Sequence, residues 1–295
     1  MIINPKELNS SEFHGYMLGA IAPRPIAFAS TIDKDGNPNL SPFSFFNAFG
    51  SNPPLVIFSP ALRGRDAVAK NTLMNLREVD EVVINIVSYE MVQQMSLAST
   101  EYPRGVNEFI KAGFTPVEST LIKPFRVKES PVQMECKVKQ IIQTGVKGGA
   151  ANLVICEIIL MHINDGVLTE QGKIDPVKID QVARMGANWY TRAAKGLFEV
   201  PKPLTTFGIG VDQLPESVRK SKVLTGNDLG MLGNMEHIPS AEELKLFSER
   251  RDVSTLLAAI KGDEGSEIAI HIAARQLLAE HKTEEALKLL LLNLK

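Results

Sequence analysis

Residues 21–60 read IAPRPIAFASTIDKDGNPNLSPFSFFNAFGSNPPLVIFSP and contain the pattern that decides the fold. The apolar run Ile26–Ser30 is followed by two β-branched residues, and together they predict a strand. Asp33–Asn37 predicts a tight hairpin turn, because an Asp-Gly pair accommodates the positive φ that such turns need. Leu55–Ser59 predicts a second apolar strand, since the two prolines before it prevent a helix from extending backwards.

Residues 41–50, SPFSFFNAFG, lie between these strands and combine aromatic rings, hydroxyls and an amide in one short segment. One interpretation is that these side chains line a flat, partly apolar ligand with a polar rim. The other is an aromatic core strand bounded by turn residues. The local chemistry leaves both interpretations open.

Three motifs follow one another in this region: PRPIAFAST, a DxxGxxN turn, and NLSPFSFFNAFGSNPPLVIF. In this order they resemble the flavin reductase-like family of FMN-binding split β-barrel proteins, in the branch that includes the flavoredoxins. Further family-like motifs extend the resemblance across roughly residues 13–200. The resemblance implies a mainly β, α+β fold, in which an FMN-binding split β-barrel has flanking helices.

The middle of the chain supports this fold class on its own residues. Val132–Val138, Lys139–Gln143 and Asn152–Ile163 have strand-like composition, and a glycine-rich turn at 145–149 joins the last two. Short connections between successive strands favour antiparallel neighbours, as in a barrel, over a doubly wound parallel sheet. Residues 101–119, EYPRGVNEFIKAGFTPVES, resemble a family segment and form either a lid beside the flavin or a structured surface loop.

The chain has 295 residues, a formal net charge of −2, 44% hydrophobic residues and 22% charged residues, which is ordinary for a globular protein. Lysine and arginine are scattered, so we expect no nucleic-acid partner. The first residues lack the basic and apolar pattern of a secretion signal. The longest apolar run, Leu153–Ile163, is interrupted by Glu157 and His162 and is too short to cross a membrane. We therefore expect a cytoplasmic protein without a membrane partner.

Several classes of catalytic site lack their motifs in this sequence. No cluster has the spacing of metal ligands, and Cys136 and Cys156 are expected to be small buried hydrophobes. No GxGxxG follows a strand, and neither a GxSxG elbow nor a Walker A loop is present. No pair of carboxylates stands out from the other acidic residues. A chain without an evident acid, base or nucleophile fits an enzyme whose cofactor carries the chemistry.

A phosphate site is indicated after the second strand. Arg63, Arg65, Lys70 and Thr72 lie near the start of a helix that we expect to begin at Asp66. Helix N-terminal N–H groups favour an anion, and cationic and hydroxyl side chains can complete the site. A solvated basic helix face would have the same sequence, so the residues alone leave this alternative open.

The resemblance implies cofactor-binding roles for particular positions. Lys70-Asn71-Thr72 stands where the family carries a Lys-Asp-Thr-like motif that holds the FMN phosphate, with Asn in place of the acidic residue. Arg24 of the Pro-Arg-Pro element would lie close to this site. The isoalloxazine ring and the ribityl chain would be lined by Ser30, Thr31, Ser44, Phe45 and Asn47.

Two later segments resemble family elements near the reactive part of the flavin. HINDGVLTEQGKID begins at His162, and RMGANWYTR begins at Arg184 and is similar to the family's Arg-Leu-Gly-Gly-x-x-Tyr, with Ala187 in place of the second glycine. The resemblance implies that His162 and Arg184 are catalytic and lie near the ring or the nicotinamide approach, with Arg184 coming from the partner subunit. On the residues alone, a single histidine on a strand is more often structural.

The last third of the chain differs in kind, and we expect a domain boundary after residue 204. Residues 1–204 are expected to form the flavin reductase-like domain, and residues 205–295 a helical extension that the resemblance does not clearly reach. Ser240–Glu243 has the capping-box pattern of a helix start, and leucine-rich faces predict helices over 267–281 and 283–292. These faces need a partner surface, so a helical interaction module is an open alternative. No chemistry is assigned to this extension.

The resemblance implies an FMN-binding oxidoreductase, an NAD(P)H:flavin oxidoreductase that transfers hydride from NADH or NADPH to the flavin N5. It also implies a homodimer with FMN at the interface, and reduced flavin that leaves or passes electrons to an acceptor protein. The alternative is a flavoredoxin-type electron carrier that keeps its FMN and has little NAD(P)H activity of its own. A third interpretation is a flavin-binding or structural protein without turnover, whose tail mediates assembly.

Overall fold

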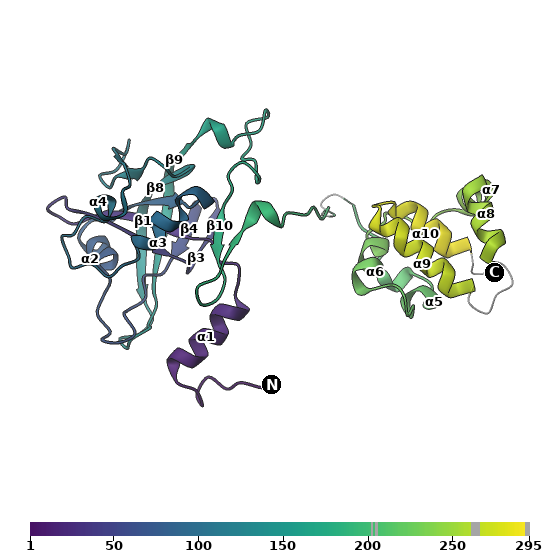
Figure 1. The fold of residues 1–295 in the computed structure, drawn as a ribbon, viewed down its shortest axis with the longest axis horizontal. Coiled ribbons are helices and arrows are strands. Elements are labelled where there is room, and N and C mark those ends of the chain that lie inside the picture. Colours follow the sequence, from purple (N-terminus) through teal and green to yellow (C-terminus); the bar gives the residue numbers. More distant parts are fainter. Residues whose placement is uncertain (202, 204–205, 261–265, 293–295) are drawn as a thin grey trace. The chain divides into compact units, whose positions relative to one another are not determined.

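The chain divides into two compact units, residues 1–198 and residues 199–295, which we call the β unit and the helical unit. Figure 1 shows the strands and α1–α4 in the β unit and α5–α10 in the helical unit. This computed structural model describes the whole chain except residues 202, 204–205, 261–265 and 293–295. The expected boundary between 204 and 205 lies outside the described residues.

One seven-stranded sheet forms the centre of the β unit, and each pair of neighbouring strands is antiparallel. The strands lie in the order β2 (Pro38–Phe43), β1 (Ala27–Ile32), β5 (Glu81–Ile86), β8 (Val132–Gln143), β9 (Asn152–Ile163), β4 (Pro54–Phe58) and β3 (Phe46–Ser51). The residues predicted as two strands from 132 to 143 form the single strand β8, with register shifts in its pairing to β9. β9 has the predicted bounds.

The two outermost strands, β2 and β3, follow each other directly in the chain, with only Ser44 and Phe45 between them. A link of this length spans at most about 11 Å between its flanking Cα atoms. The sheet therefore curls until its two edges approach, which produces a barrel that is split between β2 and β3. The predicted fold class, α+β with a split β-barrel, is confirmed.

Strand β1 is buried along its whole length because both of its faces are covered. Ala27 and Ala29 point into the barrel core, together with Phe58 and Ile84. Phe28 points the other way, into a second apolar cluster that includes side chains of the short helices. This explains why the sequence reads as a continuous apolar run without alternation.

The β1–β2 turn is held by the side chain that begins it. Asp33 Oδ1 accepts hydrogen bonds from the backbone N–H groups of Asp35 and Asn37, at 3.0 and 2.9 Å. Gly36 has a φ of 86°, which a residue with a Cβ adopts at a cost. The predicted hairpin turn is thus present, for the predicted reason.

The first helices of the β unit are short, and one begins later than expected. Ala67 has a φ of 56°, and Asp66 Oδ1 accepts the Val68 N–H in a turn, so no helix continues through these residues. The prediction of a helix start at Asp66 was wrong, because the side chain of Asp66 caps this turn instead. The four helices are α1 (Ser10–Ala20), α2 (Asn71–Glu78), α3 (Val92–Leu97) and α4 (Glu108–Ala112).

Small two-stranded sheets and single-turn helices complete the β unit. The sheets pair β6 (Pro116–Val117) with β7 (Arg126–Val127), and β10 (Val182–Arg184) with β11 (Tyr190–Arg192). The backbone of β10 also pairs with the Pro-Arg-Pro element, because Arg24 and Arg184 exchange N–H···O bonds of 2.8 and 2.9 Å. This pairing connects the start of the barrel to a segment 160 residues further along the chain.

The helical unit has its own apolar core, to which each of the helices α5 to α10 contributes residues, among them Leu232, Phe247, Val253, Ala274 and Leu287. The capping box at Ser240 and Glu243 is formed, and it begins α7 as predicted. The helices are α5 (Glu216–Arg219), α6 (Gly226–Gly233), α7 (Ala241–Glu249), α8 (Arg251–Ile260), α9 (Ser266–Ala279) and α10 (Thr283–Leu292). Among the described residues of both units, no helix has the length and hydropathy needed to cross a membrane.

Candidate functional site

Three neighbouring cavities of the β unit share lining residues and together form one cleft. The charged cavity has a volume of about 210 Å³, the long cavity about 920 Å³ and the side cavity about 380 Å³. Ser99 lines all three. Ser44 lines both the side and the long cavity, and Lys70 lines both the long and the charged cavity.

The charged cavity opens at the start of helix α2. Lys70 is the N-cap residue of this helix, and no side chain caps its first turn. The first N–H groups of a helix lack intrahelical partners and carry the positive end of the helix dipole. Arg63, Lys70 and Arg104 add three cationic side chains to the lining. This donor set fits an anion such as a phosphate group.

The cations of this cavity are paired with carboxylates. Lys70 Nζ lies 3.0 Å from Glu101 Oε1, and Arg63 Nη1 lies 3.9 Å from Glu101 Oε2. Arg65, which lies outside the lining, has its Nη2 2.8 Å from the same Oε2. The hydrogen bond from Lys70 lowers the pKa of Glu101, and the positive charges of Lys70, Arg65 and Arg63 lower it further. Arg104 pairs with Glu78 at 2.7 Å.

Thr72 is tied into a buried polar network behind the cavity. Its hydroxyl donates to Asn39 Oδ1 at 2.7 Å, and Asn39 Nδ2 donates to Glu108 Oε1 at 3.0 Å. The Leu40 N–H donates to the other oxygen of Glu108 at 3.0 Å. Burial raises the pKa of Glu108. The Thr72 hydroxyl donates its hydrogen to Asn39, so it has none left for an anion in the cavity. The hydrogen-bond donors available to an anion are the backbone N–H groups of the first turn of α2.

Asn71 connects helix α2 to the loop after α3. Its side-chain Nδ2 donates to the Tyr102 carbonyl at 3.3 Å, and both residues line the charged cavity. An acidic residue at position 71 would have no N–H for this bond. Asn71, which replaces the acidic residue of the family's Lys-Asp-Thr pattern, therefore has a hydrogen-bond partner that an acidic side chain would lack.

The long cavity has apolar and aromatic walls. Phe13, His14 and Met17 of α1 line one part, and Ser44 and Phe45 of the β2–β3 link line another. The rings of His14 and Phe45 lie edge to face, with centroids 6.0 Å apart. Flat apolar walls with hydroxyl groups at their edge fit an aromatic ring system with a polar rim.

The side cavity is lined by Arg184 and Tyr190 of the β10–β11 hairpin. The Arg184 guanidinium lies over the Tyr190 ring, 4.7 Å from its centroid, and its Nη2 donates to the Ala187 carbonyl at 2.7 Å. These contacts hold a positive charge at the cavity wall. Of the two residues predicted to be catalytic, Arg184 thus lines the cleft of its own chain.

Arg24 lies behind the cleft and stabilises its walls. It is 5% exposed and donates to the backbone carbonyls of Leu18, Ile21 and Met185. Burial and the nearby charge of Arg184 lower the pKa of Arg24. Its hydrogen bonds join the end of α1 to the segment after β10, so its contribution to the cleft is positional.

Ser30, Thr31 and Asn47 do not line the cleft. Ser30 and Thr31 are fully buried within β1, and Thr31 Oγ1 accepts a hydrogen bond from Asn75 at 3.2 Å. Ser30 Oγ has no hydrogen-bond partner among the described residues. Asn47 is exposed on the edge strand β3. The cofactor-binding roles of these three residues stay predictions.

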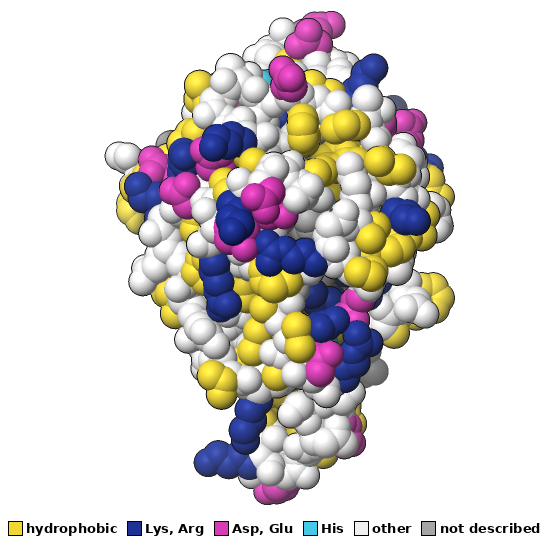
Figure 2. Space-filling model, turned by 90° about the vertical axis from the view of Figure 1, so that its left-hand side faces the viewer, with side chains coloured by type: hydrophobic (Ala, Val, Ile, Leu, Met, Phe, Trp, Pro, Cys, Tyr) yellow, Lys and Arg dark blue, Asp and Glu magenta, His cyan; other side chains and the backbone are white. Residues whose placement is uncertain are grey.

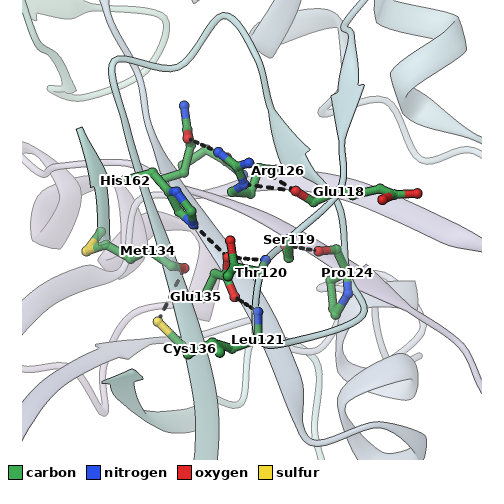
Figure 3. A network of polar contacts seen from close by, with 12 residues as sticks. Glu118, Ser119, Thr120, Leu121, Pro124, Arg126, Met134, Glu135, Cys136 and His162 are labelled. Atoms are coloured by element: carbon green, nitrogen blue, oxygen red, sulfur yellow. Dashed lines mark hydrogen bonds and ion pairs between the residues drawn. The ribbon is translucent and has the colours of Figure 1, made fainter. Parts of the chain in front are cut away.

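His162 pairs with a buried carboxylate at the far end of β9 (Figure 3). Its Nε2 lies 2.7 Å from Glu135 Oε1, and Glu135 also accepts the Thr120 and Leu121 N–H groups, each at 2.7 Å. Burial alone would raise the pKa of Glu135, but these hydrogen bonds outweigh burial and lower it. His162 lines none of the three cavities, so a catalytic role for it stays a prediction.

Sequence reasoning missed the acidic partners of the cleft. Glu101 and Glu108 lie in the segment 101–119, which is predicted as a lid or a structured surface loop and to which no acidic site residue is assigned. Glu108 follows the helix cap Asn107, where an acidic residue is common at any helix start. No local pattern distinguishes Glu101 from a solvated surface acid. Figure 2 shows basic and acidic side chains interspersed over the β unit, without a continuous basic surface on the described residues of this face.

Comparisons with known proteins agree with this fold. The sequence profile described as "Flavin reductase like domain" matches residues 18–189. An Aquifex aeolicus (strain VF5) protein is 35% identical over 188 residues, covering 64% of this chain and 93% of that protein. Nitrilotriacetate monooxygenase component B from Bacillus cereus has a TM-score of 0.64 at 29% identity, covering 68% of this chain and 98% of its own. For Pseudomonas fluorescens 2-nitrobenzoate 2-nitroreductase NbaA, the TM-score is 0.61 at 26% identity, with coverages of 70% and 100%.

The matched profile spans more than half of the chain and lies within the β unit, which holds the cleft. The helical unit begins after the last matched residue. Two further solved structures, a protein described as a putative flavin reductase with a split barrel domain and a flavoredoxin, resemble this chain in fold. This chain therefore belongs to the flavin reductase-like family.

Proposed function

We propose that the β unit binds FMN in the cleft and catalyses NAD(P)H-dependent flavin reduction. The observation that carries this proposal is the composition of the cleft, which joins an anion-binding end to an aromatic-walled cavity. A phosphorylated aromatic cofactor needs both ends. Membership of the flavin reductase-like family supports a flavin as that cofactor.

The phosphate end is assigned to Lys70, Asn71 and the backbone N–H groups of the first turn of α2. Lys70 supplies a charge, and the helix terminus supplies directed donors. Asn71 keeps the neighbouring loop against the helix through Tyr102. Thr72 contributes through its backbone, because its hydroxyl is bonded to Asn39.

The ring end is assigned to Ser44 and Phe45, which line the long cavity where the barrel is split. Arg184 supplies a fixed positive charge at the wall, where it stabilises negative charge on a bound ring system. A bound flavin would supply the redox chemistry, as the acceptor, at N5, of a hydride from NADH or NADPH. The protein orients the reactants, and this role needs no proton-transferring side chain.

We also propose that the active form is a homodimer with FMN at the interface. The edge strand β3 is largely exposed and carries Asn47 and, two residues later, Phe49, which is 64% exposed. Trp189, near Arg184, is 75% exposed. Asn47 and His162 lie outside the cleft of their own chain, so they reach a flavin only if a second copy brings them to it.

The test is an absorbance spectrum of the purified protein followed by anaerobic titration with NADH and with NADPH. We expect an oxidised-flavin spectrum after addition of FMN, and rapid bleaching by at least one of the two nicotinamide cofactors. The variant Arg184→Gln should bleach more slowly while it still binds FMN. Failure to take up FMN would refute the proposal.

A second candidate function is electron transfer from a tightly held flavin to another protein. The name of one structural relative, nitrilotriacetate monooxygenase component B, describes a component of a larger monooxygenase, which favours an acceptor protein for this chain as well. In this case the bound FMN would bleach with dithionite but only slowly with NADH or NADPH. The same titration therefore separates the two functions.

A further inference from the structure

Glu101 lies where the charged cavity meets the long cavity, and it lines both. We propose that the Glu101 carboxylate competes with the phosphate group of the flavin for the basic side chains of the charged cavity. The carboxylate would hold the phosphate-binding cations when the site is empty and would weaken the binding of phosphorylated flavins when they arrive. This inference rests on the proposed function of the cleft.

Two of the cations that the carboxylate contacts, Lys70 and Arg63, line the charged cavity, and the third, Arg65, lies outside its lining. Oε1 lies 3.0 Å from Lys70 Nζ, while Oε2 lies 2.8 Å from Arg65 Nη2 and 3.9 Å from Arg63 Nη1. The side chain of Glu101 is 36% exposed, so it is accessible from the cleft. One carboxylate thus neutralises part of the charge of three basic side chains.

The loop that carries Glu101 is held in place by its neighbours. The Tyr102 carbonyl accepts a hydrogen bond of 3.3 Å from Asn71 Nδ2, and the Tyr102 N–H donates to the Thr100 carbonyl at 2.8 Å. Glu101 lies between these two residues and is therefore fixed next to the first turn of α2. The three basic neighbours also keep the carboxylate ionised, because they lower its pKa.

A phosphate monoester and Glu101 cannot both use the full charge of these cations. The phosphate carries about −1.5 to −2 charges near neutral pH, so it is repelled by a carboxylate that remains in place. If the carboxylate moves away, its ion pairs with Lys70 and Arg65 are lost instead. Either way, the binding free energy of a phosphorylated flavin is reduced, whereas that of riboflavin, which has no phosphate, is not.

The alternative to competition is preorganisation, which predicts the opposite sign for the change in FMN affinity. By pairing with Lys70 and Arg65, Glu101 can keep both side chains in position and reduce the entropy lost on binding. In that case removal of its charge would weaken FMN binding. The sign of the change in FMN affinity therefore decides between competition and preorganisation.

The experiment measures the dissociation constants of FMN and riboflavin by quenching of flavin fluorescence, with the full chain at low and high ionic strength. The variant is Glu101→Gln, and the matched control is Glu170→Gln, an exposed carboxylate outside the three cavities. For Glu101→Gln we expect FMN to bind about tenfold more tightly at low salt, with riboflavin unchanged. The gain should shrink at high salt, because screening weakens the repulsion. Inorganic phosphate should compete with FMN more effectively in the variant than in the control.

Two results would overturn the inference while leaving the proposed function intact. One is an unchanged ratio of FMN to riboflavin affinity in Glu101→Gln, and the other is weaker FMN binding in this variant. If neither flavin binds to the unsubstituted chain or to the variant, the proposed function fails as well. The control variant should behave like the unsubstituted protein with both flavins.

Discussion

The β unit and the helical unit bury different kinds of side chain. In the β unit, buried polar or charged residues are numerous and include Arg24, Asn39, Glu108 and Glu135. In the described part of the helical unit, His271 is the one buried polar side chain. Desolvating polar and charged groups costs free energy unless each finds a partner. A core that serves stability alone has little need of buried polar or charged side chains.

The difference agrees with the placement of the candidate cleft in the β unit. Some of the buried polar residues of the β unit line the cleft or hold its walls, as Glu108 does through Asn39 and Arg24 does through backbone carbonyls. The helical unit buries leucines and alanines against one another in a core of its own. We therefore expect the two units to respond separately to substitutions. Spectroscopy can test this, because the single Trp and all four Tyr residues belong to the β unit.

The largest expected effect is the removal of a core leucine from the helical unit. Leu287→Ala deletes a side chain that is 1% exposed, and we expect it to destabilise this unit by about 3 kcal/mol, through lost burial and the cavity left behind. Circular dichroism at the helix band should show unfolding at lower denaturant. The near-ultraviolet signal of the β unit and its FMN binding should not change. A parallel shift of both signals would show that the units unfold together.

A somewhat smaller effect is expected from the carboxylate beneath the 118–126 loop of the β unit. Glu135→Gln replaces an acceptor of three hydrogen bonds by a group with one oxygen, and should destabilise the β unit by about 2 to 3 kcal/mol. Near-ultraviolet dichroism during urea unfolding measures this. Glu118→Gln, an exposed change in the same loop, is the control. Equal stability of the two variants would contradict the role assigned to Glu135.

A binding effect comes next and concerns only the β unit. Lys70→Met removes a cation of the charged cavity and should weaken FMN binding about tenfold, with riboflavin binding unchanged. Lys128→Met, at an exposed position outside the cleft, should bind both flavins as the unsubstituted protein does. Titration by flavin fluorescence gives the dissociation constants. An equal loss for both flavins would place the phosphate elsewhere.

The smallest effect expected is a pH dependence in the helical unit. Burial lowers the pKa of His271 in the folded chain, although Glu267 opposes this. Ser221 Oγ accepts the Val223 and Leu224 N–H groups, so its hydroxyl donates to the unprotonated His271 Nδ1 at 2.8 Å. A histidine in the unfolded chain titrates at about pH 6.5, so as the pH falls the unfolded chain binds the proton before the folded chain does. The stability that the unprotonated His271 contributes to this unit should therefore be fully present above that pH and be lost progressively below it.

Thermal unfolding followed at the helix band between neutral and mildly acidic pH measures this dependence. His271→Gln should remove most of it, and His237→Gln, an exposed histidine of the same unit, should leave it in place. The same slope in both variants would rule out His271 as the titrating group.

The sequence by itself determined many of the local elements of both units. The strand before Asp33, the Asp-Gly turn, the β9 strand and the α7 capping box were all predictable. Each depends on interactions within a few residues, such as side-chain alternation, a positive φ or a cap. The family motifs also gave the fold class, because they name a known arrangement of these elements.

Only the tertiary structure decided which charges meet and which polar residues are buried. Glu101 joins Lys70 from 31 positions away, and Glu135 joins His162 from 27. Ser30 lies in a strand covered on both faces, which its own sequence position does not reveal. The physical reason is the distance along the chain over which each interaction acts. Local propensities depend on residues within a few positions of one another. Burial and ion pairing depend on how the closed sheet brings distant segments together.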